Sequence, residues 1–120
     1  RHAKSSWSDP SLADVDRPLA KRGRKDAPRM GAVLSAFDCV PDVILSSPAR
    51  RARETAELTA RAAGFRGDIR WEESFYGGSA GDLMAALRRL PDDVQRPMLV
   101  GHNPTMEATA AALLGDGAFA

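Results

Sequence analysis

Two histidines and a small set of arginines could bind and transfer an anionic group. His2 and His102 are the two histidines of the 120-residue chain, Arg1 directly precedes the first, and Arg51 lies in an arginine-rich stretch between them. A histidine ring nitrogen can attack phosphorus and form a covalent intermediate. A guanidinium group binds phosphoryl oxygens in pairs. These residue types therefore predict phosphoryl chemistry, which in this scheme needs no metal and no other cofactor.

Short apolar runs alternate with longer helical stretches along the chain. We expect strands over residues 42–46, 69–71 and 97–101, and helices over residues 18–37, 49–63, 80–90 and 105–114. The first helix contains glycines and a proline that favour a bend, and Ser47 and Pro48 suit the N-cap and first position of the second. Apolar strands between helices predict an α/β fold with a mostly parallel sheet, flanked by helices on both faces as a three-layer sandwich.

The polar residues follow the expected strands at the point where each one ends. Ser46 ends the run 42–46, Ser47 and Arg51 follow it, and His102 comes after the run 97–101. Arg1 and His2 would follow a third strand if an apolar segment precedes them. In open α/β sheets ligands bind beyond the carboxyl ends of the strands, so we expect both histidines and the arginines to meet at one edge of the sheet.

Four segments resemble the motifs of the histidine phosphatase superfamily, in its order and at similar separations. They are Arg-His-Ala-Lys-Ser-Ser-Trp over residues 1–7, Asp-Arg-Pro-Leu over 16–19, Ser-Ser-Pro-Ala-Arg-Arg-Ala-Arg-Glu-Thr-Ala over 46–56 and Val-Gly-His-Asn-Pro over 100–104. The Ala-Lys form of the first segment is most similar to bacterial phosphohistidine phosphatases of the SixA type. The resemblance implies a phosphoglycerate mutase-like fold.

The resemblance also implies roles for particular residues. His2 would be the nucleophile, Arg1 and Arg51 would bind the phosphoryl oxygens, and His102 would complete the pocket. Lys4, Ser5 and Asn103 lie inside the same motifs, and we expect them to contact substrate. The expected partners are a phosphorylated protein or a small phosphorylated substrate, with phosphate ion as the product.

A possible general acid is suggested less directly. In mutase-like relatives a glutamate stands shortly before a Tyr-Gly pair, and Glu73 precedes Tyr76 and Gly77 here. Ser74 replaces the arginine that those relatives carry next to the glutamate. The neighbouring Glu72 also fits an ordinary polar surface. An imidazole leaving group is protonated easily near neutral pH, so a phosphohistidine substrate would need little help from an acid.

Composition limits the other possibilities. The chain has the size of one domain over residues 1–120, and the family pattern suggests that this domain lacks its first strand and its C-terminal part. A net charge of +1, one cysteine and short apolar runs give no indication of a nucleic-acid partner, a disulfide or a membrane span. Two histidines and one cysteine offer no metal-ligand spacing. We expect a cytoplasmic protein.

Three alternatives stay open. Small-molecule phosphate monoesters could be the substrate in place of protein phosphohistidine, although the short chain leaves little room for a lid over a small molecule. Residues 77–81 match the Gly-x-Ser-x-Gly pattern of serine hydrolases around Ser79, with Asp92 or Asp93 and His102 following in triad order. Glycine and serine there also fit a turn and a helix N-cap. A binding module that holds an anion without turnover is the third possibility.

Overall fold

The computed structural model describes residues 1–115. Its elements, in chain order, are the 3-10 helix η1 (Asp14–Asp16), α1 (Lys21–Ala36), β1 (Val43–Ser46), α2 (Arg50–Ala63), β2 (Ile69–Trp71), the 3-10 helix η2 (Glu73–Phe75), α3 (Ala80–Arg88), β3 (Pro97–Val100) and α4 (Thr105–Leu114). The three strands and the helices between them agree with the expected alternation.

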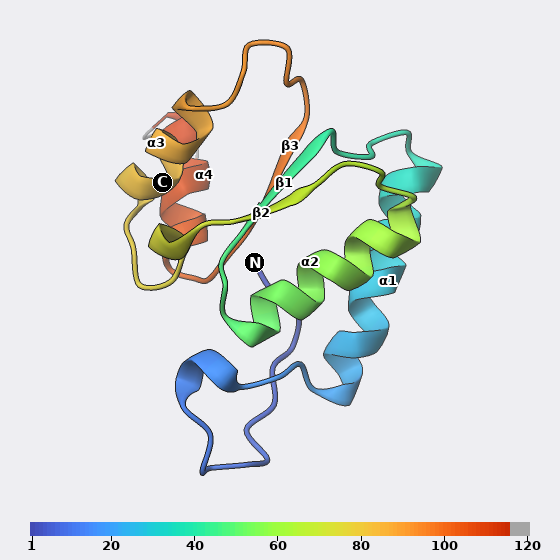
Figure 1. The fold of residues 1–120 in the computed structure, drawn as a ribbon, viewed down its shortest axis with the longest axis vertical. Helices are drawn as coiled ribbons and strands as arrows, with labels where there is room; N and C mark the ends of the chain where they lie inside the picture. Colours follow the sequence, from blue (N-terminus) through green and yellow to red (C-terminus); the bar gives the residue numbers. More distant parts are fainter. Residues whose placement is uncertain (116–120) are drawn as a thin grey trace.

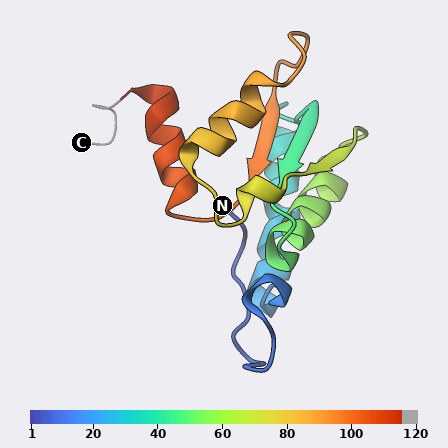
Figure 2. The ribbon, with the colours of Figure 1, turned by 60° about the vertical axis from the view of Figure 1, so that its left-hand side comes forward.

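A parallel sheet in the order β2-β1-β3 forms the middle layer. Ile44 of β1 pairs with Ile69 of β2 on one side and with Met98 of β3 on the other. Helices α1 and α2 lie on one face of the sheet, and α3 and α4 lie on the other (Figures 1 and 2). The expected three-layer α/β sandwich with a parallel sheet is confirmed.

Alternate residues of β1 supply the two halves of the hydrophobic core. Val43 and Leu45 pack with Phe75 and Leu83 on the α3 face. Ile44 packs against the alanines of α2 on the opposite face. Because successive strand side chains point to opposite faces, a fully buried apolar strand is what a sheet covered on both sides requires. This packing fixes the positions of the strand ends, and the polar residues follow directly after those ends.

The first helix begins later than the sequence predicts. Residues 18–20 are extended and pair with residues 4–6: the Ser6 amide donates to the Pro18 carbonyl at 2.8 Å, and the Ala20 amide donates to the Lys4 carbonyl at 2.8 Å. Helix α1 then runs unbroken from Lys21, with Pro28 inside it. The local pattern could not show this pairing, because the partners of residues 18–20 lie at the start of the chain.

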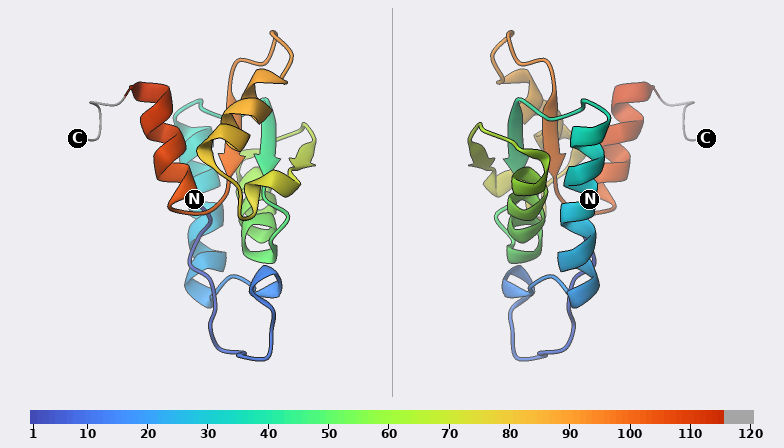
Figure 3. Two further views of the ribbon diagram at one scale, coloured as in Figure 1. Left: turned by 90° about the vertical axis from the view of Figure 1, so that its left-hand side faces the viewer. Right: turned by 90° about the vertical axis from the view of Figure 1, so that its right-hand side faces the viewer.

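The pairing brings α1 against the N-terminal segment. A Cβ atom at position 23 would collide with the backbone carbonyl of Lys4, so only glycine permits this approach. The loop over residues 7–17 is closed by the same pairing and projects beyond the carboxyl end of the sheet (Figure 3). The first turns of α1 therefore lie beside the chain segment that carries His2.

The start of the second helix also differs from expectation. Helix α2 begins at Arg50, and its N-cap position is Ala49, without a side-chain cap. Ser47 and Pro48 lie in the loop before it. The Ser47 hydroxyl accepts a hydrogen bond from the Ala49 amide at 3.2 Å and also contacts His102, so it does not cap the helix. The position expected for an N-cap thus belongs to the polar cluster described below.

Within residues 1–115, no helix combines the length and the apolar character needed to cross a bilayer.

Candidate active site

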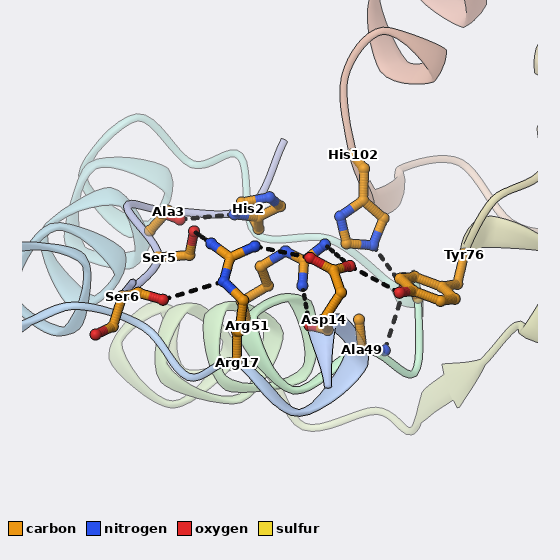
Figure 4. Close-up of polar contacts among 11 residues, drawn as sticks. His2, Ala3, Ser5, Ser6, Asp14, Arg17, Ala49, Arg51, Tyr76 and His102 are labelled. Atoms are coloured by element: carbon orange, nitrogen blue, oxygen red, sulfur yellow. Dashed lines mark hydrogen bonds and ion pairs between the residues drawn. The ribbon is translucent and has the colours of Figure 1, made fainter. Parts of the chain in front are cut away.

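The N-terminal segment is bound at the carboxyl end of the sheet by backbone hydrogen bonds. The His2 amide donates to the Gly101 carbonyl, just beyond β3, at 3.0 Å. The Ala3 amide donates to the Thr55 hydroxyl of α2 at 3.1 Å, and that hydroxyl donates to the Arg51 carbonyl at 2.7 Å. These contacts bring the side chain of His2 to the ends of β1 and β3, as the sequence predicts (Figure 4).

A cavity of about 440 Å³ opens at this point. Among the residues that line it are seven predicted from the sequence: Arg1, His2, Lys4, Ser5, Arg51, His102 and Asn103. The imidazole rings of His2 and His102 face each other with their centroids 5.1 Å apart. The two histidines and both predicted arginines therefore share one hollow, although 100 residues separate the two rings along the chain.

The hydrogen bond of His2 sets which ring nitrogen is available for attack. Its Nδ1 lies 2.7 Å from the Ala3 carbonyl oxygen. A carbonyl can only accept, so Nδ1 carries the proton and donates it. In the neutral ring Nε2 then keeps its lone pair. Nε2 is thus the ring nitrogen of His2 that is free to act as a nucleophile, as the sequence predicts for this residue.

One ring nitrogen of His102 makes a hydrogen bond, and the other makes none among the described residues. Its Nε2 lies 2.8 Å from the Ser47 hydroxyl oxygen, and its Nδ1 is buried without a hydrogen-bond partner among the described residues. The Ser47 hydroxyl, which also accepts from the Ala49 amide, can either donate its own proton to Nε2 of His102 or accept one from it. When Ser47 donates, the His102 proton lies on Nδ1 and is available to an anion.

Arg51 is buried, with an exposed fraction of 7%, and the backbone and side chain of Asp14 hold its guanidinium. Arg51 donates to the Asp14 carbonyl at 2.7 Å and to the Asp14 carboxylate at 3.0 Å. The same carboxylate accepts a 2.7 Å hydrogen bond from the Tyr76 hydroxyl. Tyr76 in turn packs edge-on against the His102 ring. Asp14 therefore connects the loop over residues 7–17 to Arg51 and to Tyr76, which packs on His102 (Figure 4).

A second buried guanidinium, Arg17, lies next to Arg51. It donates to the Asp14 carboxylate at 2.8 Å, to the Ser5 hydroxyl at 2.6 Å and to the Ser6 carbonyl at 3.1 Å. The Trp7 ring covers it at 3.2 Å, a cation–π contact. Trp7, whose type suggests core packing, is 73% exposed and packs on this cation at the surface.

The cluster contains more positive than negative charge. Arg17 and Arg51 share the single carboxylate of Asp14, and Arg1 lines the same cavity. Hydrogen bonds from Tyr76, Arg17 and Arg51 hold the pKa of Asp14 far below its usual range, so it is ionised. The remaining positive charge, in a site partly withdrawn from water, favours binding of an anion.

The same environment keeps both histidines neutral. Burial lowers the pKa of His2, and the charges of Arg51 and Arg1 lower it further, while the hydrogen bond to Ala3 raises it. Burial, followed by the charge of Arg51, lowers the pKa of His102 to about 4. At neutral pH both rings therefore lack a proton on one nitrogen, as a nucleophilic His2 requires.

Four further site residues have no catalytic or binding role predicted from sequence. Asp14, Arg17, Tyr76 and Ser47 reach the cluster by contacts that the local pattern does not encode. The available signals were indirect, since Arg17 and Ser47 lie in two of the family-like motifs and Tyr76 belongs to the Tyr-Gly pair that marked Glu73.

The remaining predicted residues differ in their surroundings. Lys4 and Asn103 are exposed at the rim of the cavity, and the Asn103 amide donates to Glu107 at 3.1 Å. Glu73 is exposed at the start of η2 and is not among the cavity-lining residues, although it lies at the same end of the sheet. Its role as general acid stays a prediction.

The residues that the serine hydrolase alternative requires do not come together in the structure. Ser79 caps α3 in a reciprocal arrangement with Asp82, the capping box that the turn-and-cap interpretation expects. Asp92 and Asp93 precede β3 and His102 follows it, so these residues lie at opposite ends of that strand. His102 bonds to Ser47 and not to Ser79.

Among residues 1–115, no three histidine, cysteine or acidic side chains come together as a metal-binding group.

Comparison with protein families gives a match over residues 1–112 to the family described as "Histidine phosphatase superfamily (branch 1)". An uncharacterised chloroplast protein of Arabidopsis thaliana is 40% identical over 124 residues, which covers 96% of this chain and 57% of that protein. The chain thus spans a little over half the length of that relative.

Comparison with solved structures gives the same fold. A candidate phosphohistidine phosphatase, SixA, from Agrobacterium tumefaciens superposes with a TM-score of 0.89 at 37% identity, covering 98% of this chain and 75% of that one. The structure of a protein histidine phosphatase SixA complexed with tungstate superposes with a TM-score of 0.84 at 22% identity, covering 92% and 71% of the two chains.

Proposed function

This chain belongs to the histidine phosphatase superfamily (branch 1), and we propose that it is a phosphatase that uses His2 as its nucleophile and protein phosphohistidine as its substrate. One observation carries the proposal. The Nδ1 atom of His2 is bonded to Ala3, and the ring faces His102 and the buried Arg51 across a single cavity. That arrangement leaves a nucleophilic nitrogen beside donors suited to phosphoryl oxygens.

In the first step Nε2 of His2 attacks phosphorus. A P–N bond to His2 forms, and the bond between phosphorus and the leaving group breaks. For a phosphohistidine substrate the leaving group is an imidazole, which takes a proton from solvent. Arg1, Arg51 and Nδ1 of His102 donate to the phosphoryl oxygens. All three residues line the cavity, and Nδ1 of His102 has no other hydrogen-bond partner among the described residues.

In the second step water attacks the same phosphorus. The new P–O bond replaces the P–N bond, one proton of the water stays on the departing hydrogen phosphate, the other passes to solvent, and the neutral His2 ring is restored. The hydrogen bond to Ala3 keeps the ring in one orientation through both steps. Asp14 holds the Arg51 guanidinium in position through two hydrogen bonds, and a guanidinium can donate to two phosphoryl oxygens at once.

One comparison supports phosphohistidine as the substrate: the solved relative from Agrobacterium tumefaciens, a candidate phosphohistidine phosphatase, is 37% identical over nearly the whole chain. Another neighbour of the same fold is a complex with tungstate, a tetrahedral oxyanion of the phosphate type, which supports a phosphoryl-binding site without distinguishing the carrier. Small phosphate monoesters are the second candidate, since the donors in the cavity recognise the phosphoryl group and not its carrier.

The test uses a peptide phosphorylated on histidine with a radioactive label. The protein should release labelled phosphate and, after rapid quenching in base, should carry an acid-labile label on His2. His2→Ala should abolish both signals and retain the fold. Ser79→Ala is the matched control, because it changes another polar residue near the same end of the sheet, and it should retain turnover.

Turnover by His2→Ala, or a label that maps to another residue, would reject the nucleophile. Faster turnover of small monoesters than of the phosphohistidine peptide would reject the substrate and leave the nucleophile standing.

A further inference from the structure

A row of basic side chains continues from the rim of the catalytic cavity along the first turns of α1. Arg22 and Asp26 line the catalytic cavity and also a second hollow of about 510 Å³, whose other lining residues are Lys21, Lys25 and Arg29. We call Lys4, Lys21, Arg22, Lys25 and Arg29 the basic ledge. Because two residues line both hollows, the ledge is continuous with the active-site cavity.

The ledge has a surplus of positive charge. Asp26 is the one acidic residue that lines the two hollows, and it pairs with Arg22 at 3.4 Å and with Arg29 at 3.5 Å. Within residues 1–115, Lys21 and Lys25 have no acidic partner. Because the whole chain carries a net charge of only +1, this surplus is a local segregation of charge.

The position of the ledge is built into the fold. Gly23 lies directly on the Lys4 carbonyl, and the Ala20 amide bonds to that carbonyl, so the first turns of α1 stay beside the segment that carries His2. From Lys21 to Arg29 a helix rises about 12 Å, roughly the length of four extended residues. The ledge is therefore long enough to contact several consecutive residues of a bound chain.

We propose that the ledge docks an acidic polypeptide segment next to the phosphorylated histidine of the substrate. This proposal rests on the function proposed above and adds a specificity: glutamate and aspartate side chains flanking the phosphohistidine contact Lys21, Lys25 and their neighbours. A polypeptide fits better than a small anion, because the ledge extends through a second hollow beyond the phosphoryl site. Complementary charges of this kind speed association and depend on salt.

The experiment compares two peptides that differ only in the residues around one phosphohistidine, four glutamates in one and four glutamines in the other. At low ionic strength the protein should hydrolyse the glutamate peptide with a kcat/KM about tenfold higher, as several exposed charge pairs together would provide. The difference should nearly vanish in 0.5 M salt, a concentration chosen because the screening length there is only about 4 Å.

The variant pair isolates the ledge. Lys21→Glu combined with Lys25→Glu should remove or invert the preference and leave the rate on the glutamine peptide unchanged, because neither lysine lines the catalytic cavity. Arg61→Glu combined with Arg66→Glu makes the same change of charge at exposed positions near the far end of α2, and should keep the preference. Unfolding temperatures of both double variants check the fold.

Equal rates on the two peptides, or a preference that survives in the lysine variant, would overturn the docking proposal. Inorganic tripolyphosphate tests whether the ledge binds a small polyanion instead of a polypeptide. Faster hydrolysis of tripolyphosphate than of the glutamate peptide, lost in the lysine variant, would favour the small polyanion and overturn the docking proposal. Failure to hydrolyse either peptide would reject the proposed function itself, which distinguishes the two failures.

Discussion

The Nε2 atom of His102 lies 2.8 Å from the Ser47 hydroxyl, while the Nδ1 atom of the same ring is buried and has no partner within the described part of the chain. Ser47 is fully buried at the end of β1, and His102 follows β3, the neighbouring strand. A buried polar atom without a partner costs free energy unless a ligand satisfies it. With Ser47 donating to Nε2, the proton of the neutral ring lies on Nδ1, which then serves as a hydrogen-bond donor for an anion.

Replacement of Ser47 by alanine should lower kcat/KM about tenfold or more, because His102 loses the contact that fixes its tautomer and orientation. Steady-state kinetics on a phosphohistidine peptide measure the effect, and Ser47→Thr should restore part of it. Ser46→Ala is the matched control. Ser46 is equally buried and donates only to the Ser47 carbonyl, so its loss should leave kinetics nearly unchanged. Equal effects of the two alanine variants would contradict the role of Ser47.

Replacement of Asp14 by asparagine should strengthen binding of tungstate or phosphate by about tenfold, because it removes a negative charge from Arg17 and Arg51 close to the anion. The apo protein should melt at a lower temperature, since two buried guanidiniums lose their shared counter-charge. Calorimetric titration and thermal unfolding, with and without tungstate, give both quantities. Asp16→Asn, exposed on the same 3-10 helix, should change neither. Weaker tungstate binding by Asp14→Asn would contradict this prediction, because it would mean that the carboxylate assists anion binding.

The two histidines should titrate below the ordinary histidine pKa of about 6.5. Burial lowers the pKa of both, and that of His102 falls to about 4. NMR titration of the ring protons can resolve them, since the chain has only these two histidines and His2→Ala assigns the signals. A pKa for His102 above 6.5 would contradict the desolvated, cation-flanked site.

The same shift predicts how stability depends on pH. The unfolded chain binds a proton on this residue below about 6.5, whereas the folded chain resists protonation of His102 until about pH 4. The stabilising contribution is therefore complete above pH 6.5 and is lost as the pH falls from 6.5 to 4. In urea unfolding experiments, the free energy of unfolding should fall less between pH 6.5 and pH 4 for His102→Gln than for the unmodified protein.

Glu73 offers a test of the leaving group. Because its side chain is exposed and does not line the cavity, Glu73→Gln should change phosphohistidine hydrolysis far less than the roughly 100-fold expected for loss of a general acid. An alkyl phosphate, whose alkoxide leaving group needs a proton, measures the contribution that Glu73 makes as an acid. A 100-fold loss on the phosphohistidine peptide would establish Glu73 as an acid even for an imidazole leaving group.

The sequence by itself determined the fold class and the four central site residues. Apolar strands between helices indicated a covered parallel sheet, and Arg51 and His102 stand within a few residues of strand ends. Because parallel strands deliver their carboxyl ends to one edge, such residues must meet whatever the details of packing. Arg1 and His2 were predictable through their motif. The structure places them through the hydrogen bonds of the His2 amide to the Gly101 carbonyl and of the Ala3 amide to the Thr55 hydroxyl.

Only the tertiary structure decided what surrounds those four residues. Asp14 reaches Arg51 across 37 residues of sequence and Tyr76 across 62, and the pairing of residues 4–6 with 18–20 shortened α1 and positioned its basic ledge. None of these contacts follows from periodicity or capping, which report on neighbours three or four residues apart. The pairing of residues 4–6 with 18–20 holds the loop over residues 7–17 beside the buried guanidiniums. The contacts form because a guanidinium that is removed from water needs hydrogen-bond partners, and the polar side chains of this loop supply them.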